Sequence, residues 1–160
     1  MNTDDIFQTV RLADLDKYNS WGLHNPNLNI LNENKENLLH IAISYKHNWI
    51  CFDLIHKGIN INAQNDEGQT PLQYAIEVMN VPVVNAILLN GGDVNIQDEY
   101  GNNAVWTAVF NARGNYELVN LILKYGGNAN SKNKRGRSPL DFAIQINDSS
   151  LIKILSNNYE

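Results

Sequence analysis

An internal repeat of 33 to 35 residues constrains the fold of this chain more than any other feature. The segment GQTPLQYA at 68–75 recurs as GNNAVWTA at 101–108 and GRSPLDFA at 136–143, and a weaker copy, KENLLHIA, stands at 35–42. A second column keeps the same register, at Asn29, Asn62, Asn95 and Asn130. Such a period predicts an array of similar units, each of which buries its apolar face against its neighbours.

The first part of each unit has the signals of a short helix. N-cap residues are expected at Asn37, Thr70, Asn103 and Ser138. Proline follows two of these caps, at the first helical position, where its missing N–H costs nothing. Gln73 stands three residues after Thr70, which is the spacing of a capping box.

The second part of each unit carries an apolar ladder with the spacing of one helical face. Its columns are Ile50, Val83, Leu118 and Leu151; Cys51, Val84, Val119 and Ile152; and Leu54, Ile87, Ile122 and Leu155. Gly58, Gly91 and Gly126 follow as left-handed helix ends. Turn residues come next, such as those at 65–68. Each unit is therefore predicted to be a helix, a second helix and a hairpin.

Composition narrows the class of protein. The chain has 160 residues, 43% hydrophobic and 18% charged, as is usual for a soluble domain. The net charge of −5 disfavours general nucleic-acid binding. The first residues include Asp4 and Asp5 instead of a basic region, so no secretory signal is expected. A single cysteine, Cys51, excludes an internal disulfide and favours a reducing cytoplasm.

These features together resemble the ankyrin repeat. The best match covers 65–72 (NDEGQTPL) and 88–95 (LLNGGDVN), and the resemblance extends over about residues 32–156. His40 keeps the histidine that is usual in the family, whereas Lys35 replaces the turn glycine. The third unit carries two extra residues around 111–115.

The resemblance implies an all-α fold. We expect an ankyrin-repeat solenoid, with helix-turn-helix units joined by β-hairpin turns. One domain would hold a degenerate N-terminal capping repeat at 1–31 and four repeats at about 32–64, 65–97, 98–132 and 133–160. The capping repeat should form helices near 5–13 and 14–22. The closing helix should run over 149–158, where Ser156 replaces an apolar ladder residue and suits the polar outer face of a terminal cap.

Members of the family mostly bind other proteins, through a concave surface of hairpin tips and first helices. Carried over to this chain, the resemblance implies the following protein-binding residues: Glu33, Glu36, Asp66, Glu67, Gln69, Glu77, Glu99, Tyr100, Asn102, Trp106, Phe110, Asn111, Lys134, Arg135 and Arg137.

The charges of these residues are sorted along the chain. The first three tips are acidic and the last is basic, with Tyr100, Trp106 and Phe110 between them. We therefore expect a partner with a basic region that meets the first repeats and an acidic region near the fourth. Three alternatives stay open: exposed tips are polar in any such array, Trp106 packs between first helices, or the basic cluster touches a nucleic acid or membrane.

The sequence offers no catalytic or metal site. The four histidines, His24, His40, His47 and His56, fall in different structural positions, so a metal centre is not expected. Cys51 belongs to the apolar ladder, which predicts a buried thiol rather than a nucleophile. The tip carboxylates face solvent, without a pocket to shift their pKa values. We expect no cofactor.

The function indicated is a non-catalytic protein–protein interaction module that acts by occupancy and is monomeric when free. One specific hypothesis is an immunity protein that neutralises a cognate bacterial toxin. The alternatives are a host-directed effector or viral protein that captures a eukaryotic factor, and a scaffold or regulatory subunit docked on an enzyme. A fragment of a longer array is also possible, and Ser156 argues against it.

Overall fold

The computed structural model describes residues 3–24 and 27–157, which form ten helices and no strand. The chain divides into two compact units, Met1–Gly92 (unit 1) and Asp93–Glu160 (unit 2), and each is described by itself. Within the described residues, no helix has the length and apolar character that crossing a membrane requires.

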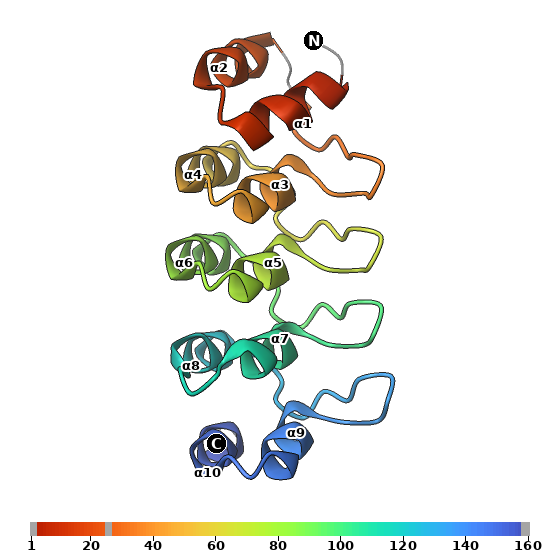
Figure 1. Ribbon diagram of the computed structural model, residues 1–160, viewed down its shortest axis with the longest axis vertical. Helices are drawn as coiled ribbons and strands as arrows, with labels where there is room; N and C mark the ends of the chain where they lie inside the picture. Colours follow the sequence, from red (N-terminus) through yellow and green to blue (C-terminus); the bar gives the residue numbers. More distant parts are fainter. Residues whose placement is uncertain (1–2, 25–26, 158–160) are drawn as a thin grey trace. The chain divides into compact units, whose positions relative to one another are not determined.

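Unit 1 consists of three helix pairs (Figure 1). The first helices α1, α3 and α5 pack against one another in sequence, and the second helices α4 and α6 pack side by side. Their bounds are Thr3–Leu12 (α1), Leu15–His24 (α2), Leu38–Ser44 (α3), Asn48–His56 (α4), Pro71–Glu77 (α5) and Val81–Leu89 (α6).

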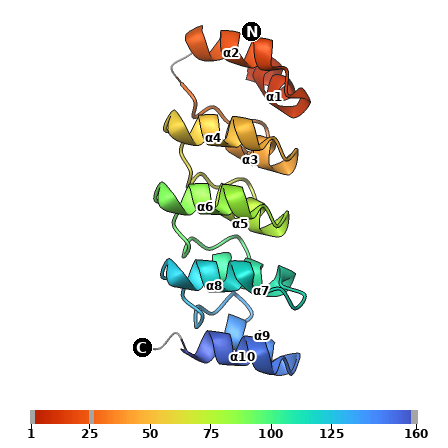
Figure 2. The same cartoon turned by 90° about the vertical axis from the view of Figure 1, so that its left-hand side faces the viewer.

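Unit 2 consists of two helix pairs, which Figure 2 shows from the side. Helix α7 packs on both α8 and α9, and α9 packs on α10. The bounds are Ala104–Asn111 (α7), Glu117–Lys124 (α8), Pro139–Gln145 (α9) and Ser149–Ser156 (α10).

The helix caps form as the sequence predicts. Thr70 and Gln73 make a complete capping box at α5, and the Asn103 side chain accepts from the Trp106 backbone N–H at α7. Asn37 also forms a capping box, because the His40 side chain reaches back to the backbone of the cap residue. An N-cap of this kind contributes about 1 kcal/mol to stability.

The predicted apolar ladder is the core of both units. All its members are buried except Ile152, which is half-buried. Full burial of such an aliphatic side chain contributes about 1.5–3 kcal/mol, so this ladder supplies much of the packing energy of the second helices.

The asparagine column joins successive hairpins. Asn29 Oδ1 accepts a hydrogen bond of 2.8 Å from the Asn60 backbone N–H. In unit 2, Asn95 Oδ1 accepts from the Asn128 N–H at 2.9 Å while its Nδ2 donates to the Gly126 carbonyl at 3.0 Å. The periodic asparagines therefore serve the backbone between repeats.

The two extra residues of the third unit lie in the turn between α7 and α8, at the right of Figure 2. Arg113 and Gly114 have φ angles of 44° and 86° there. The corresponding turns before α4, α6 and α10 each use a single non-glycine residue with positive φ: Lys46, Met79 and Asn147.

The two ends of the chain differ from expectation in detail. Helices α1 and α2 are shifted by up to two residues from the predicted ranges. Helix α10 ends at Ser156, and residue 158, the predicted end, lies outside the described residues. The expected polar face is incomplete, because Ile144 is 56% exposed where Val109, at the same register, is 3% exposed.

Candidate protein-binding surface

Each hairpin is shaped by one side chain near its tip. The four hairpins span residues 27–36, 60–69, 93–102 and 128–137. In the first, Asn32 Oδ1 accepts from the backbone N–H groups of Asn34 at 3.0 Å and Glu36 at 2.9 Å. The same two bonds recur in every hairpin, with Asn65, Asp98 and Asn133 in the role of Asn32. This column explains why the tips keep one conformation.

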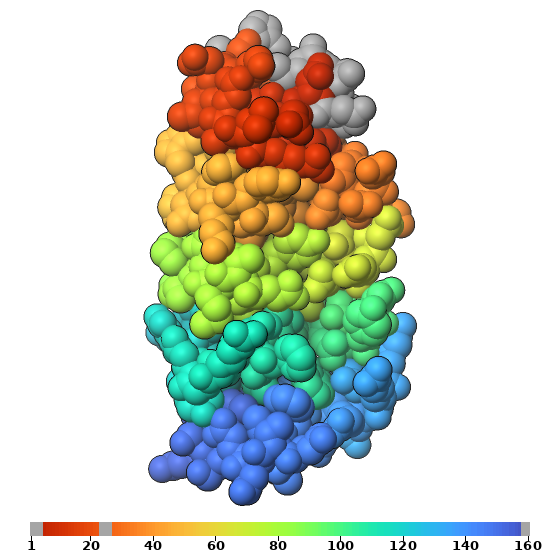
Figure 3. Space-filling view, in the orientation of Figure 1, coloured from red at the N-terminus to blue at the C-terminus, as the bar shows by residue number. Residues whose placement is uncertain are grey.

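Backbone hydrogen bonds hold neighbouring hairpin tips together within each unit. The Asp66 N–H donates to the Asn34 carbonyl at 3.0 Å in unit 1. The Lys134 N–H donates to the Tyr100 carbonyl at 2.8 Å in unit 2. Because the tips are tied to each other, the side chains on them project from a continuous edge within each unit, the right-hand edge in Figure 3.

Most of the candidate carboxylates of unit 1 are engaged by the chain itself. Glu36 accepts from the Asn32 amide at 2.8 Å and from the Tyr74 hydroxyl at 2.9 Å. Burial and the bond to Glu36 raise the pKa of Tyr74, so its hydroxyl stays a donor. Asp66 forms an ion pair of 2.6 Å with Lys35.

Gln69 and Glu77 bind each other, with 2.8 Å between Gln69 Nε2 and Glu77 Oε1. Glu33 and Glu67 are exposed at the tips, and no ion pair holds either carboxylate within the described part of unit 1. Of the six candidates in unit 1, these two are the carboxylates most available to a partner.

Unit 2 places three aromatic side chains near the fourth repeat. Phe110 on α7 is 69% exposed and its ring lies 6.0 Å from that of Phe142 on α9. Trp106 lies beneath, 7% exposed, with its ring 5.8 Å from Phe142. Trp106 therefore packs between first helices, as the packing alternative predicts, and offers little surface to a partner. Tyr100, on the hairpin tip, is 59% exposed.

The basic candidates Lys134, Arg135 and Arg137 are exposed on the fourth hairpin, together with Lys132. None forms an ion pair within the described residues. Lys132 and Arg137 lie close enough to Asp141 to help lower the pKa of its carboxyl, mainly through hydrogen bonds from Ser138.

Two of the remaining candidates serve the fold. The Asn102 amide donates to Asp98 at 3.3 Å, and its oxygen accepts from Asn133 at 3.1 Å. The Asn111 amide donates to the Thr107 carbonyl at 2.9 Å, which closes the end of α7. Glu99 is exposed at the tip beside Tyr100.

His40 and Cys51 both lie in the core. The His40 Nε2 lies 3.1 Å from the Gln69 carbonyl, while Nδ1 accepts from the Asn37 N–H at 3.2 Å. Burial lowers the pKa of His40 to about 4 and raises the pKa of the Cys51 thiol to about 12. Among the described side chains, no three His, Cys, Asp or Glu residues gather as metal ligands would; the His24 side chain lies outside this description.

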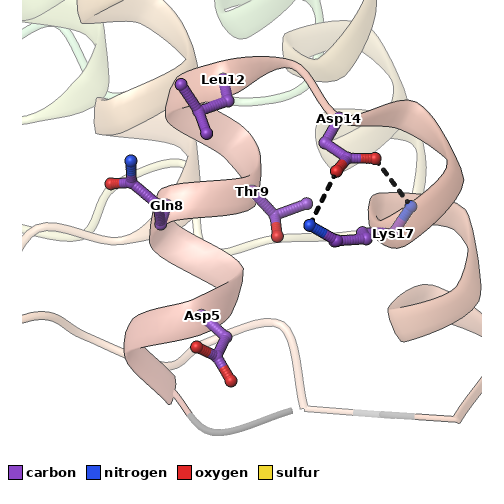
Figure 4. A pocket seen from close by; sticks show the side chains of 6 residues that line it. All are labelled: Asp5, Gln8, Thr9, Leu12, Asp14 and Lys17. Atoms are coloured by element: carbon purple, nitrogen blue, oxygen red, sulfur yellow. Dashed lines mark hydrogen bonds and ion pairs between the residues drawn. The ribbon is translucent and has the colours of Figure 1, made fainter.

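An open hollow of about 460 Å³ lies on α1 and the start of α2 (Figure 4). Asp14 and Lys17 form an ion pair of 3.1 Å at its edge, and Thr9 and Gln8 line it from α1. The paired charges leave the hollow without a polar group directed at a ligand.

Sequence reasoning missed an apolar patch on the second helices of unit 1. Trp49 and Phe52 on α4 are 52% and 42% exposed, and Leu89 on α6 is 73% exposed. Trp49 and Phe52 lie three residues apart and outside the ladder, a spacing that marks a second helical face. Polar residues occupy the same positions in α8 and α10.

Comparison with known proteins supports this architecture. A family model described as "Ankyrin repeats (3 copies)" matches residues 12–98 and 77–160. The nuclear factor NF-kappa-B p105 subunit of Gallus gallus is 29% identical over 135 residues, which cover 79% of this chain and 14% of that protein.

Two further relatives show a similar partial match. The ankyrin repeat and SAM domain-containing protein 6 of Rattus norvegicus is 29% identical over 102 residues, 61% of this chain and 11% of that protein. Ankyrin repeat protein FPV024 of fowlpox virus (strain NVSL) is 30% identical over 91 residues, 57% of this chain and 15% of that protein. The chain thus spans less than a fifth of the length of these relatives.

Proposed function

Because this chain belongs to the ankyrin-repeat family, generally a non-catalytic interaction module, we propose that it binds another protein through its hairpin tips and first helices. The observation that carries the proposal is the exposure of Tyr100 and Phe110, 59% and 69%, on that side of unit 2. Large aromatic side chains of this kind are the usual anchors of protein interfaces.

The proposed activity is occupancy: the chain masks or tethers its partner without chemical change. We expect the partner to present a basic region to the exposed Glu33 and Glu67 of unit 1. The free chain is proposed to be a monomer without a cofactor. A single, buried Cys51 suits a reducing cytoplasm.

The specific role that we propose first is an immunity protein that neutralises a cognate toxin. An acidic net charge of −5 supports it, because a toxin that acts on nucleic acid is basic and would be attracted to such a chain. Co-expression with a toxin encoded beside its gene tests this role. Growth that is not rescued by the chain would remove it.

A second candidate is capture of a host factor by a viral or host-directed protein. The match to FPV024 of fowlpox virus favours it. A third, a scaffold or regulatory subunit on an enzyme, is supported by the apolar patch of Trp49, Phe52 and Leu89, since such contacts are broad and apolar.

The deciding experiment is affinity capture from the source cell with the wild-type chain and a Tyr100→Ala, Phe110→Ala double variant. A partner that is retained by wild type and lost with a variant that still melts cooperatively would support this surface. Retention by both proteins would place the contact elsewhere, for example at the turn around Arg113, and the partner's identity would separate the three roles.

A further inference from the structure

Unit 2 carries an exposed surface that combines aromatic and basic side chains. We define this aromatic–basic surface by Tyr100, Phe110, Phe142, Lys134 and Arg135. All five lie on the third and fourth hairpins or on α7 and α9, so they belong to one compact unit. In Figure 3 these segments run from teal to blue.

The exposed ring of Phe110 is not needed by the fold. Its register position is occupied by Ser44, Glu77 and Gln145 in the other repeats, all of them polar and exposed. Phe110 is 69% exposed and touches the half-buried Phe142 at a centroid distance of 6.0 Å. The two rings present apolar area to solvent, and removal of that area from water is favourable.

The fourth hairpin differs from the others in charge. Residues 128–137 contain four cationic side chains and no carboxylate, whereas each of the first three hairpins contains at least two carboxylates. Lys134 and Arg135 form no ion pair within the described residues, in contrast to Lys35, which pairs with Asp66. Their charge is available to an acidic group from outside.

The aromatic and basic parts of the surface are held in place by the fold. The Lys134 N–H donates to the Tyr100 carbonyl at 2.8 Å, and the Asn133 amide donates to Asn102 at 3.1 Å. Gly101 lets the two tips approach, since a Cβ there would lie 2.8 Å from Lys134 N. Preorganised side chains lose less entropy when they bind a partner.

We propose that this surface binds an acidic segment of a partner protein, with an aliphatic or aromatic side chain seated on Phe110 and Phe142. Aspartate or glutamate side chains beside that anchor meet Lys134 and Arg135. The inference rests on the proposed function and adds the chemistry of the bound segment. Asp98 and Glu99 on the adjacent hairpin would repel a continuous phosphate backbone, which favours a peptide over a nucleic acid.

The test is selection from a random-peptide phage library on the immobilised chain, followed by fluorescence anisotropy with the enriched peptides. We expect the enriched peptides to carry acidic residues next to an aromatic or aliphatic one. Phe110→Gln, which copies Gln145, and the double change Lys134→Gln, Arg135→Gln should each weaken their binding by about tenfold. Lys124→Gln, an exposed cation on α8, is the matched control and should leave binding unchanged.

Three results would overturn the inference. Enriched peptides could be neutral or basic, or bind the variants as well as wild type, and no peptide at all could enrich. Binding of oligouridine or of phosphatidylserine vesicles at physiological salt in place of the peptides would assign the surface to a different ligand. The proposed function stands in each case if affinity capture still yields a partner, so the two failures are distinguishable.

Discussion

Lys35 adopts a φ of 56° at the turn position where Gly68, Gly101 and Gly136 stand in the other hairpins. A left-handed conformation costs a residue with a Cβ about 1–2 kcal/mol. The Lys35 side chain also forms an exposed ion pair with Asp66, 2.6 Å long, and such pairs contribute little. The strained backbone therefore dominates at this site.

We expect Lys35→Gly to raise the free energy of unfolding by about 1 kcal/mol relative to Lys35→Gln. Both variants lose the ion pair, and the second keeps a Cβ, so their difference isolates the backbone strain. Urea denaturation with a common slope measures it. Equal stabilities of the two variants would show that the turn is relaxed around Lys35.

Gly101 combines a positive φ of 82° with a close backbone approach, because a Cβ there would meet Lys134 N at 2.8 Å and Asn133 Cα at 3.1 Å. Gly136 has a φ of 73° and open space around the same position. The two glycines share the conformational requirement, and only the first has the steric one.

Gly101→Ala should therefore destabilise the chain by at least about 1 kcal/mol more than Gly136→Ala, through displacement of the fourth hairpin. Thermal unfolding of both variants at pH 7 gives the comparison. A similar loss in both would indicate that the hairpins separate without cost.

Helices α1 and α2 are tied to the next repeat by polar contacts. The Tyr18 hydroxyl donates to Asp53 at 2.7 Å, and the Lys57 ammonium lies 2.6 Å from the same carboxylate. His47 Nε2 lies 3.0 Å from the Arg11 carbonyl. Burial and the bond to Asp53 raise the pKa of Tyr18, so this hydroxyl remains protonated.

Tyr18→Phe should lower the local stability of α1 and α2 by about 1–2 kcal/mol, since it removes a charge-assisted hydrogen bond and keeps the buried ring. Native-state hydrogen exchange should show about tenfold less protection in α1 and α2 and unchanged protection in α9. Loss of protection throughout the chain, or in neither helix, would contradict this view of the N-terminal pair.

The elements that sequence reasoning predicted well are those set by local chemistry. The caps at Thr70 and Asn103 and the buried ladder follow from spacing along the chain. Availability of the candidate site residues depended on distant partners and was not predictable. Glu36 is engaged by Tyr74, 38 residues away, and Trp106 is covered by the α9 packing that includes Phe142.

At the scale of the whole molecule, one buried ionisable group couples stability to pH. His40 is fully buried, and its neutral ring joins the cap of α3 to the hairpin carbonyl of Gln69. Its pKa is lowered from 6.5 to about 4 by burial. Tyr74 packs on the ring edge at 5.0 Å, and Glu36 is the nearby carboxylate that partly opposes the shift.

The sign of the effect follows from proton binding. Between pH 6.5 and 4 the unfolded chain protonates His40 and the folded chain does not, so the unfolded state is favoured as the pH falls. The contribution of His40 is complete above pH 6.5 and is lost by pH 4, where the loss reaches about 3 kcal/mol.

Replacement of His40 by the residue that the second repeat uses at the same position, His40→Gln, should remove this dependence. Gln73 forms a capping box there with Thr70, so the variant retains the cap in a form that does not titrate. Urea denaturation at several pH values between 7 and 4.5 should give a flatter profile for the variant than for wild type. The surface carboxylates titrate in both proteins, so only the difference between the two profiles reports His40. Parallel profiles would mean that the folded chain accepts the proton at His40 without opening the first repeat.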